Sequence, residues 1–201
     1  MFHSSTDLGS QVLMIYQEMD HRIKRLQDAT GLRCLTGCGT CCENPSVEAT
    51  VLEVLPLAEQ ILMMQEEEMI LAAIEEKENQ VDHSCILYRP HGPDSEKGKC
   101  TYYAYRPLLC RLFGFASRRN KFGDLEFSTC KILREKNPGT VRRAEIALFE
   151  GLDIPVYQDS FYRIGSIHPD KGFRRLPINL ALKAALEILY WKRPRGWRDA
   201  A

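Results

Sequence analysis

The stretch CLTGCGTCC, residues 34–42, places four of this chain's eight cysteines within nine positions. The N-terminal residues carry neither a basic start nor a long apolar run, so we expect no secretory signal and a cytoplasmic location where thiols stay reduced. Thiols this dense in a reducing compartment are typical of metal ligands. We expect all eight to hold metal: Cys34, Cys38, Cys41, Cys42, Cys85, Cys100, Cys110 and Cys130.

The spacing within this stretch favours a compact ligand loop. Cys38 and Cys41 form a C-x2-C pair, and Cys34 extends it to C-x3-C-x2-C. Three thiolates on one short, glycine-rich loop can cap one face of a cubane cluster. Cys42 follows Cys41 directly, so we expect the two side chains to diverge and to serve different metals or different irons; the alternative is that one of them is a bystander.

The remaining cysteines fit a second group of four, in which Cys100 and Cys110 flank a turn at Pro107 and Cys85 and Cys130 complete the set. Two four-cysteine sites are one stoichiometry, and one cluster with several structural cysteines is another. Both iron–sulfur clusters and zinc accept four thiolates. We favour iron–sulfur because a compact loop joined by distant cysteines is typical of cubane sites. Buried free cysteines are the structural alternative.

The rest of the chain predicts a mainly α fold. Apolar periodicity predicts a helix over residues 7–29, and Thr50 with Glu53 forms a capping box for a second, in which Pro56 predicts a kink or a restart. Further helices are expected from Pro138, from Pro155 and from Pro177. Two short β pieces are expected at CILY (85–88) and CTYYAY (100–105).

These expectations describe helices that flank an irregular, cysteine-rich centre organised by metal. A length of 201 residues predicts a single domain over 1–201, with the metal-binding region at 30–130 and flanking helices at 1–29 and 131–201. Basic and acidic residues number 27 each, which gives no general attraction to nucleic acid. No apolar run approaches the roughly 20 residues that span a bilayer. We therefore expect a metal ion or cluster as partner, with room for a protein partner, and neither nucleic acid nor membrane.

A second motif, CTYYAYRPLLCRLFGF from Cys100 to Phe115, carries a resemblance together with the first. The pair resembles the cysteine-cluster (CxxCxxCC) family of zinc- or iron-chelating domains, which also occurs in flagellin lysine N-methylases. The family's second signature, similar to C-x2-Y-x2-R-P-x2-C-R, is met by Cys100, Tyr103, Arg106, Pro107, Cys110 and Arg111. Its upstream cysteine before a hydrophobic pair is met by Cys85. The likeness covers roughly residues 30–130, and it departs from the family in its looser first spacing, C-x3-C.

The resemblance implies a bound iron–sulfur cluster or zinc. Arg106 and Arg111 are candidates to donate hydrogen bonds to sulfur around such a group; a surface ion pair or a carbonyl-capping role is the alternative. A cytosolic iron–sulfur protein with a redox or electron-transfer role is the leading hypothesis. A structural zinc-binding interaction module and a protein lysine N-methylase-like enzyme are the alternatives. Whether the protein is an enzyme, its substrate, its metal count and its oligomeric state stay open.

Overall fold

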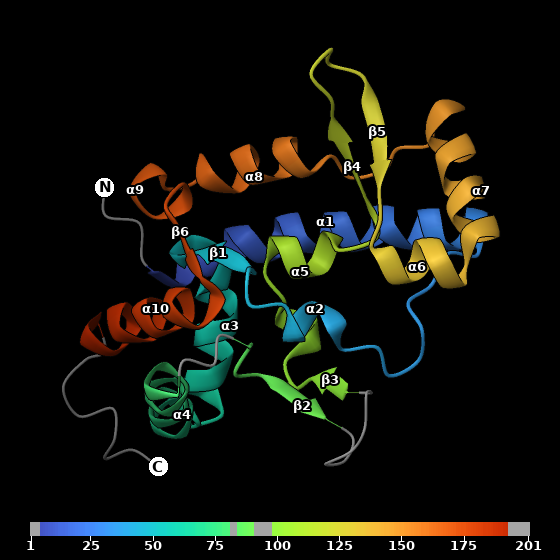
Figure 1. Cartoon of the computed structure of the whole chain (residues 1–201). Coiled ribbons are helices and arrows are strands. Elements are labelled where there is room, and N and C mark those ends of the chain that lie inside the picture. The colour runs from blue at the N-terminus through green and yellow to red at the C-terminus, as the bar shows by residue number, and fades with distance from the viewer. Residues whose placement is uncertain (1–4, 81–83, 91–97, 193–201) are drawn as a thin grey trace.

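The computed structural model describes residues 5–80, 84–90 and 98–192, and this part of the chain is mainly helical with short strands (Figure 1). That content confirms the predicted fold class. The helices are α1 (Ser5–Thr30), α2 (Thr40–Glu43), α3 (Val51–Met63), α4 (Glu67–Asn79), α5 (Leu108–Leu112), α6 (Lys131–Lys136), α7 (Pro138–Phe149), α8 (Tyr157–Gly165), α9 (Pro169–Gly172) and α10 (Ile178–Lys192), with a 3-10 turn at Tyr103–Tyr105. None of the helices in the described ranges is long and apolar enough to cross a membrane.

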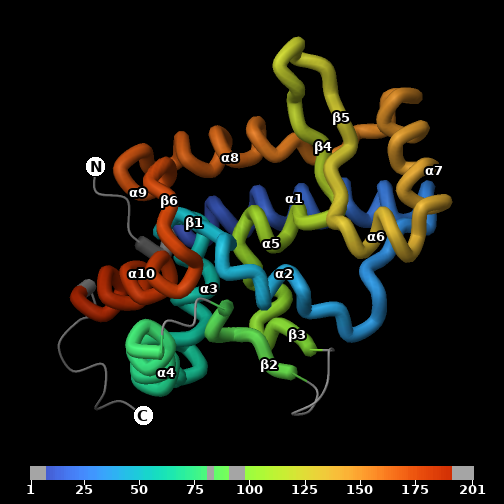
Figure 2. Tube along the Cα trace, in the orientation of Figure 1, coloured from blue at the N-terminus to red at the C-terminus, as the bar shows by residue number. Residues whose placement is uncertain are grey.

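The strands form three separate two-stranded antiparallel ladders. They are β1 (Glu48–Thr50) with β6 (Arg175–Pro177), β2 (Tyr88–Pro90) with β3 (Gly98–Cys100), and β4 (Ala116–Arg119) with β5 (Leu125–Ser128). The β1–β6 ladder joins segments far apart in the chain, as the tube in Figure 2 shows, and the Ile178 N–H extends it by donating to the Val47 carbonyl at 3.0 Å.

Helix α1 forms as its periodicity predicts. Val12, Tyr16, Met19 and Leu26 are buried on one face, and the helix packs along α3 and α7. It ends where Gly31 adopts a positive φ of 74°, with the Gly31 N–H still donating to the Gln27 carbonyl at 2.9 Å. The chain leaves this stop directly into the cysteine loop.

Helix α3 begins at the predicted capping box. The Thr50 hydroxyl accepts the Glu53 N–H at 3.1 Å, and the Glu53 carboxylate accepts the Thr50 N–H at 3.4 Å. The expected restart at Pro56 is wrong, because the helix runs unbroken from Val51 to Met63. Proline removes one intrahelical hydrogen bond, but α3 is buried between α1 and α10, and this packing holds the helix through that position.

In the second half of the chain, helix α7 begins and ends at the residues predicted for it. Pro138 occupies the first turn of α7, and Gly151 ends it at φ 92°, donating to the Leu148 carbonyl while the Leu152 N–H reaches the Ala147 carbonyl at 2.8 Å. The β4–β5 hairpin was not predicted. It turns through residues 120–123, where the Asn120 side chain accepts two backbone N–H groups.

The β piece predicted over CTYYAY is wrong beyond its first residue. Strand β3 ends at Cys100, and Tyr103–Tyr105 forms a 3-10 turn. A strand needs a neighbour to pair with, and β2 begins only at Tyr88, opposite Cys100. The residues before Tyr88 turn away to place Cys85 inside the molecule, so residues 102–105 have no edge to extend.

Candidate metal centre

All eight cysteines line one cavity of about 370 Å³. They reach it from the loop after α1 and from α2, from the segment before β2, from the end of β3, from α5 and from the residue before α6. All eight are free thiols. Residues spread over almost a hundred positions are therefore gathered in space, and the alternative of cysteines packed singly in separate places does not hold.

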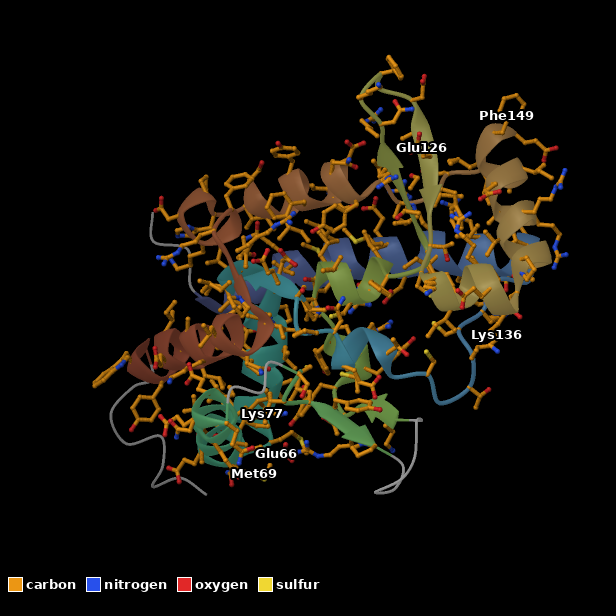
Figure 3. All side chains as sticks on the ribbon, viewed as in Figure 1. Glu66, Met69, Lys77, Glu126, Lys136 and Phe149 are labelled. Carbon is orange, nitrogen blue, oxygen red and sulfur yellow. The ribbon has the colours of Figure 1, made fainter. Side chains whose placement is uncertain are left out.

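The cavity lies among the short central elements. Figure 3 labels Met69 and Lys77 on α4, and Glu66 directly before it, at one end of the view, and Glu126 on β5 and Phe149 on α7 at the other, with α2 and α5 between them. Besides sulfur, the cavity lining is apolar, aromatic and cationic. It includes Leu57, Leu87, Phe113, Ile132, Ile178, Tyr102, Tyr103, Lys99, Arg106 and Lys131, and among the described lining residues there is no carboxylate.

The Cys42 thiol has three neighbouring thiols, those of Cys100, Cys41 and Cys85, whose influence raises its pKa. We call these four cysteines the inner group. Successive side chains on a helix are only about 100° apart, so Cys41 and Cys42 on the short α2 can approach the same neighbours. Both Cys41 and Cys42 line the cavity, and their expected assignment to different metals stays a prediction.

These neighbours make the inner thiols unequal in acidity. The neighbouring thiols raise the pKa of Cys42, whereas the Cys42 side chain lowers the pKa of Cys41 to about 6 and that of Cys100 to about 7. The Cys42 side chain also lowers the pKa of Cys85. The positive charge of Arg106 also favours the thiolates of Cys41 and Cys100.

A second, outer group consists of Cys34, Cys38 and Cys130. Although Cys34 is an exposed residue, its sulfur faces the cavity wall; desolvation, with Cys38 and Cys130 adding to it, raises its pKa to about 11. The Cys38 sulfur lies 3.6 Å from the Thr40 hydroxyl, and the Cys130 sulfur accepts the Leu133 N–H at 3.4 Å.

The predicted grouping stays a prediction, because all eight cysteines line the same cavity. The pKa of Cys42 responds most to Cys100, Cys41 and Cys85, whereas the thiols that act on the pKa of Cys34 are first Cys38 and Cys130. Linear order could not indicate this, because α2 carries Cys41 and Cys42 inward and leaves the earlier loop residues at the rim. Cys110, which is 8% exposed, lies beside the inner group, and burial together with nearby thiols raises its pKa.

The two candidate arginines lie in different places. Arg106 lines the cavity, stacks 3.4 Å above the Tyr103 ring and donates to the Tyr103 carbonyl at 2.9 Å. Arg111 is 2% exposed and does not line the cavity; it pairs with Asp20 and donates to the Ala104 carbonyl at 2.6 Å. Arg111 therefore ties α5 to α1, and only Arg106 can act on the thiols.

Cys85 is held by a residue that the sequence did not single out. Its N–H donates to the Cys42 carbonyl at 2.9 Å. The buried side chain of Asn179, at the start of α10, accepts the Ile86 N–H at 3.0 Å and donates to the Ser84 carbonyl at 2.9 Å. The side-chain amide of Asn179 thus fixes both peptide groups that flank Cys85. In the sequence, the signal for this role was a single asparagine within the apolar start of a helix.

Two glycines bring the β2–β3 ladder against the cysteine loop. The Tyr88 ring lies so close to Gly39 and Gly98 that an added Cβ at either would come within 2.2 Å of it. The Tyr88 hydroxyl donates to Glu43 at 2.9 Å, and the Gly98 N–H donates to the Gly37 carbonyl at 2.9 Å. The site therefore depends on backbone contacts that only glycine permits.

The donor set fits a thiophilic metal or cluster, since soft thiolates select zinc, copper(I) and iron–sulfur clusters. Within residues 5–80, 84–90 and 98–192, no group of three or more Cys, His, Asp or Glu side chains is placed to hold a metal ion as it stands. Ligation therefore requires rotation of thiol side chains within the cavity.

Comparison with known proteins gives one match. No curated protein and no solved structure matches the chain. The family model "CxxCxxCC: Putative zinc- or iron-chelating domain" matches residues 33–143, which is more than half of the chain and includes all eight cysteines. This protein therefore belongs to the CxxCxxCC family of zinc- or iron-chelating domains.

Proposed function

We propose that this protein holds an iron–sulfur cluster in the cysteine cavity and serves a redox or electron-transfer role in the reducing cytoplasm. The observation that carries the proposal is the convergence of eight free thiols on one cavity of about 370 Å³. Four thiolates around a single zinc, with bonds of about 2.3 Å, close on the ion and leave little space. A cavity with twice that number of sulfurs suits a larger inorganic group.

The surroundings of the sulfurs support the same proposal. After the Cys42 side chain, the backbone amides of Leu87 and Tyr102 help to lower the pKa of Cys85 and Cys100, and polar groups beside the sulfurs tune iron–sulfur clusters. Apolar side chains of the lining exclude water, and Arg106 offsets the negative charge of the thiolates. A bound cluster would supply one-electron chemistry, while these residues hold it and exclude solvent.

Structural zinc is the second candidate, and the inner group around Cys42 favours it. Sulfurs bound to one tetrahedral zinc lie about 3.8 Å apart, given bonds of about 2.3 Å, and Cys42 has three thiols near enough to raise its pKa. In that case the protein is an interaction module whose cysteine region is ordered by the ion.

Anaerobic purification with elemental analysis and an absorption spectrum tests the proposal. We expect brown protein that contains iron and sulfide and that bleaches with dithionite. Colourless protein with stoichiometric zinc would favour the zinc module, and protein without either metal would refute both. Cys38→Ser and Cys41→Ser are each expected to lose metal and soluble protein together, with Thr36→Ser in the same loop as control.

A lysine N-methylase-like activity rests on the family resemblance alone. Titration with S-adenosylmethionine tests it, and an absence of binding at millimolar concentration would remove it.

A further inference from the structure

We propose that a groove between the α3–α4 turn and residues 101–105 is a docking site for a partner protein, which inserts an aliphatic side chain flanked by lysines or arginines. The groove has a volume of about 500 Å³, and none of its described lining residues is a cysteine. The inference goes beyond the proposed function, because it concerns a surface outside the metal ligands and needs no particular metal.

Both walls of the groove present apolar and aromatic side chains. Met64 and Met69 line one wall and are 56% and 55% exposed, and Met63 beside them is 74% exposed. Residues 102–105 line the other wall and supply three tyrosines. Methionine adapts its shape to a partner, and methionine and tyrosine are both enriched at protein interfaces. Three exposed methionines next to a groove therefore differ from the single apolar residues that are scattered over an ordinary surface.

The turn that carries the methionines is fixed by its own hydrogen bonds. Gln65 adopts a positive φ of 58°, and the Glu66 N–H donates to the Ile61 carbonyl at 3.1 Å. The Tyr102 hydroxyl donates to the Glu66 carboxylate at 2.6 Å and so links the two walls. The groove is thus formed before a partner arrives, which lowers the entropic cost of binding.

The charge around the groove is negative. Residues 66–79 contain six glutamates and one lysine, and Figure 3 labels Glu66 and Met69 at this end of the molecule. Acidic residues at the start of α4 also suit the helix dipole, so they do not define a site by themselves. Arg89 lies on the rim, but its guanidinium donates to the Ile86 and Tyr88 carbonyls at 2.9 and 3.1 Å. The apolar groove therefore favours a partner with positive charges beside its apolar side chain.

The groove shares a wall with the cysteine cavity. Tyr102 and Tyr103 line both hollows, and Cys100 lies two residues before the first of them. The Arg106 guanidinium, which also lines the cavity, stacks 3.4 Å above the Tyr103 ring. A partner in the groove therefore contacts side chains that also face the thiols.

Fluorescence anisotropy with a labelled synthetic peptide tests the inference on the full-length, anaerobically purified protein. The probe has a central pair of leucines flanked by lysines, and two control peptides replace the lysines by glutamate or the leucines by serine. We expect only the first peptide to bind, with an affinity that falls as the salt concentration rises from about 50 to about 500 mM. Equal binding of the glutamate peptide, or no binding of the lysine peptide at millimolar concentration, would overturn the inference.

Variants of the lining place the peptide in the groove. Met64→Gln combined with Met69→Gln removes the apolar contact at two exposed positions and should weaken peptide binding by about tenfold. Glu66→Gln keeps a hydrogen-bond acceptor but removes the charge, and should weaken binding a few-fold. Met14→Gln and Glu150→Gln, at exposed positions outside the groove lining, are the matched controls and should leave the affinity unchanged. Groove variants that bind as tightly as these controls would refute the site, and circular dichroism verifies that each variant is folded.

Two further outcomes separate this inference from its rivals. If sedimentation shows a dimer that Met64→Gln with Met69→Gln dissociates, a second copy of the chain covers the groove, and the inference is overturned. If the purified protein binds the lysine peptide in the groove but holds no metal, the proposed function is refuted and the docking site stands.

Discussion

The helical frame of α1, α3 and α10 and the cysteine region, residues 31–47, 84–90 and 98–112 together with Cys130, are stabilised in different ways. The frame consists of long helices whose apolar faces are buried against one another. The cysteine region has helices and strands of three to five residues, tied by single hydrogen bonds and by glycine contacts. Burial alone explains the first, whereas the second places eight thiols around a cavity and lacks a comparable apolar face.

Removal of the metal should produce the largest difference in stability between the two regions. Structural zinc contributes on the order of 10 kcal/mol to the folding of small domains, so chelation under reducing conditions should release the cysteine region while the frame persists. Hydrogen exchange should accelerate by orders of magnitude at the N–H groups of Cys85 and Gly98, which are bonded to the cysteine loop, and little at Leu26 within α1. Equal loss of protection in both regions would contradict the comparison.

The frame was largely predictable because its signals are local. The apolar period of α1, the Thr50–Glu53 capping box and the stop at Gly151 each depend on residues within a few positions. The restart at Pro56 failed because tertiary packing around α3 outweighs a local preference. Local patterns therefore describe the frame well, except where burial overrides them.

The next largest effect is expected from the titration of Glu53, which lies on α3 in the helical frame and should make the free energy of unfolding depend on pH. Burial raises the pKa of Glu53 from 4.5 to about 7. Between these values the folded protein binds more protons than the unfolded chain, so its free energy of unfolding falls as the pH rises, and the loss is complete above pH 7. Glu53→Gln keeps the capping acceptor and stays neutral, and should be more stable than the parent at pH 8 by up to about 3 kcal/mol.

Urea unfolding at pH 4 and pH 8 measures this effect. The two proteins should be nearly equal at pH 4, and the difference should grow up to pH 7. Glu48→Gln, at an exposed position on β1, is the matched control and should show no growth. A Glu53→Gln variant that is destabilised at pH 8 would contradict the assignment.

The cysteine region was predictable in content but not in arrangement. The motifs identified which residues converge, and the structure gathers all eight cysteines at one cavity. The influence of Cys130 on the pKa of Cys34, the turn of Arg111 toward Asp20 and the clamp from Asn179 all depend on segments distant in sequence. Spacing along the chain carries no information about such contacts.

A glycine substitution probes the close packing of the cysteine region. Gly98→Ala forces the Tyr88 ring out of its place between Gly39 and Gly98, and overpacking of this kind costs about 1–3 kcal/mol. We expect a lower metal content and faster hydrogen exchange at the backbone N–H of position 98. Gly139→Ala in α7, where the nearest atom lies 4.0 Å away, should instead be neutral or slightly stabilising. Equal effects of the two substitutions would contradict a special role for Gly98.

Asn179 is where the frame reaches into the cysteine region, and its loss should have the smallest effect on stability. Asn179→Ala removes the acceptor of the Ile86 N–H and the donor to the Ser84 carbonyl, and two such bonds contribute about 1–2 kcal/mol. Because the amide fixes Cys85 from outside the ligand set, metal affinity should fall by about 10- to 100-fold. Competition with a chromophoric chelator and thermal unfolding measure the two quantities.

Lys183→Ala is the matched control on the same helix, since Lys183 pairs with Glu75 and Glu78 on α4. It should change thermal stability by a few tenths of a kcal/mol and leave metal affinity unchanged. If Asn179→Ala lowers stability without weakening metal binding, the amide supports α10 alone. If affinity falls while the frame keeps its helical signal, the two regions communicate through this side chain, and the frame positions the thiols as well as enclosing them.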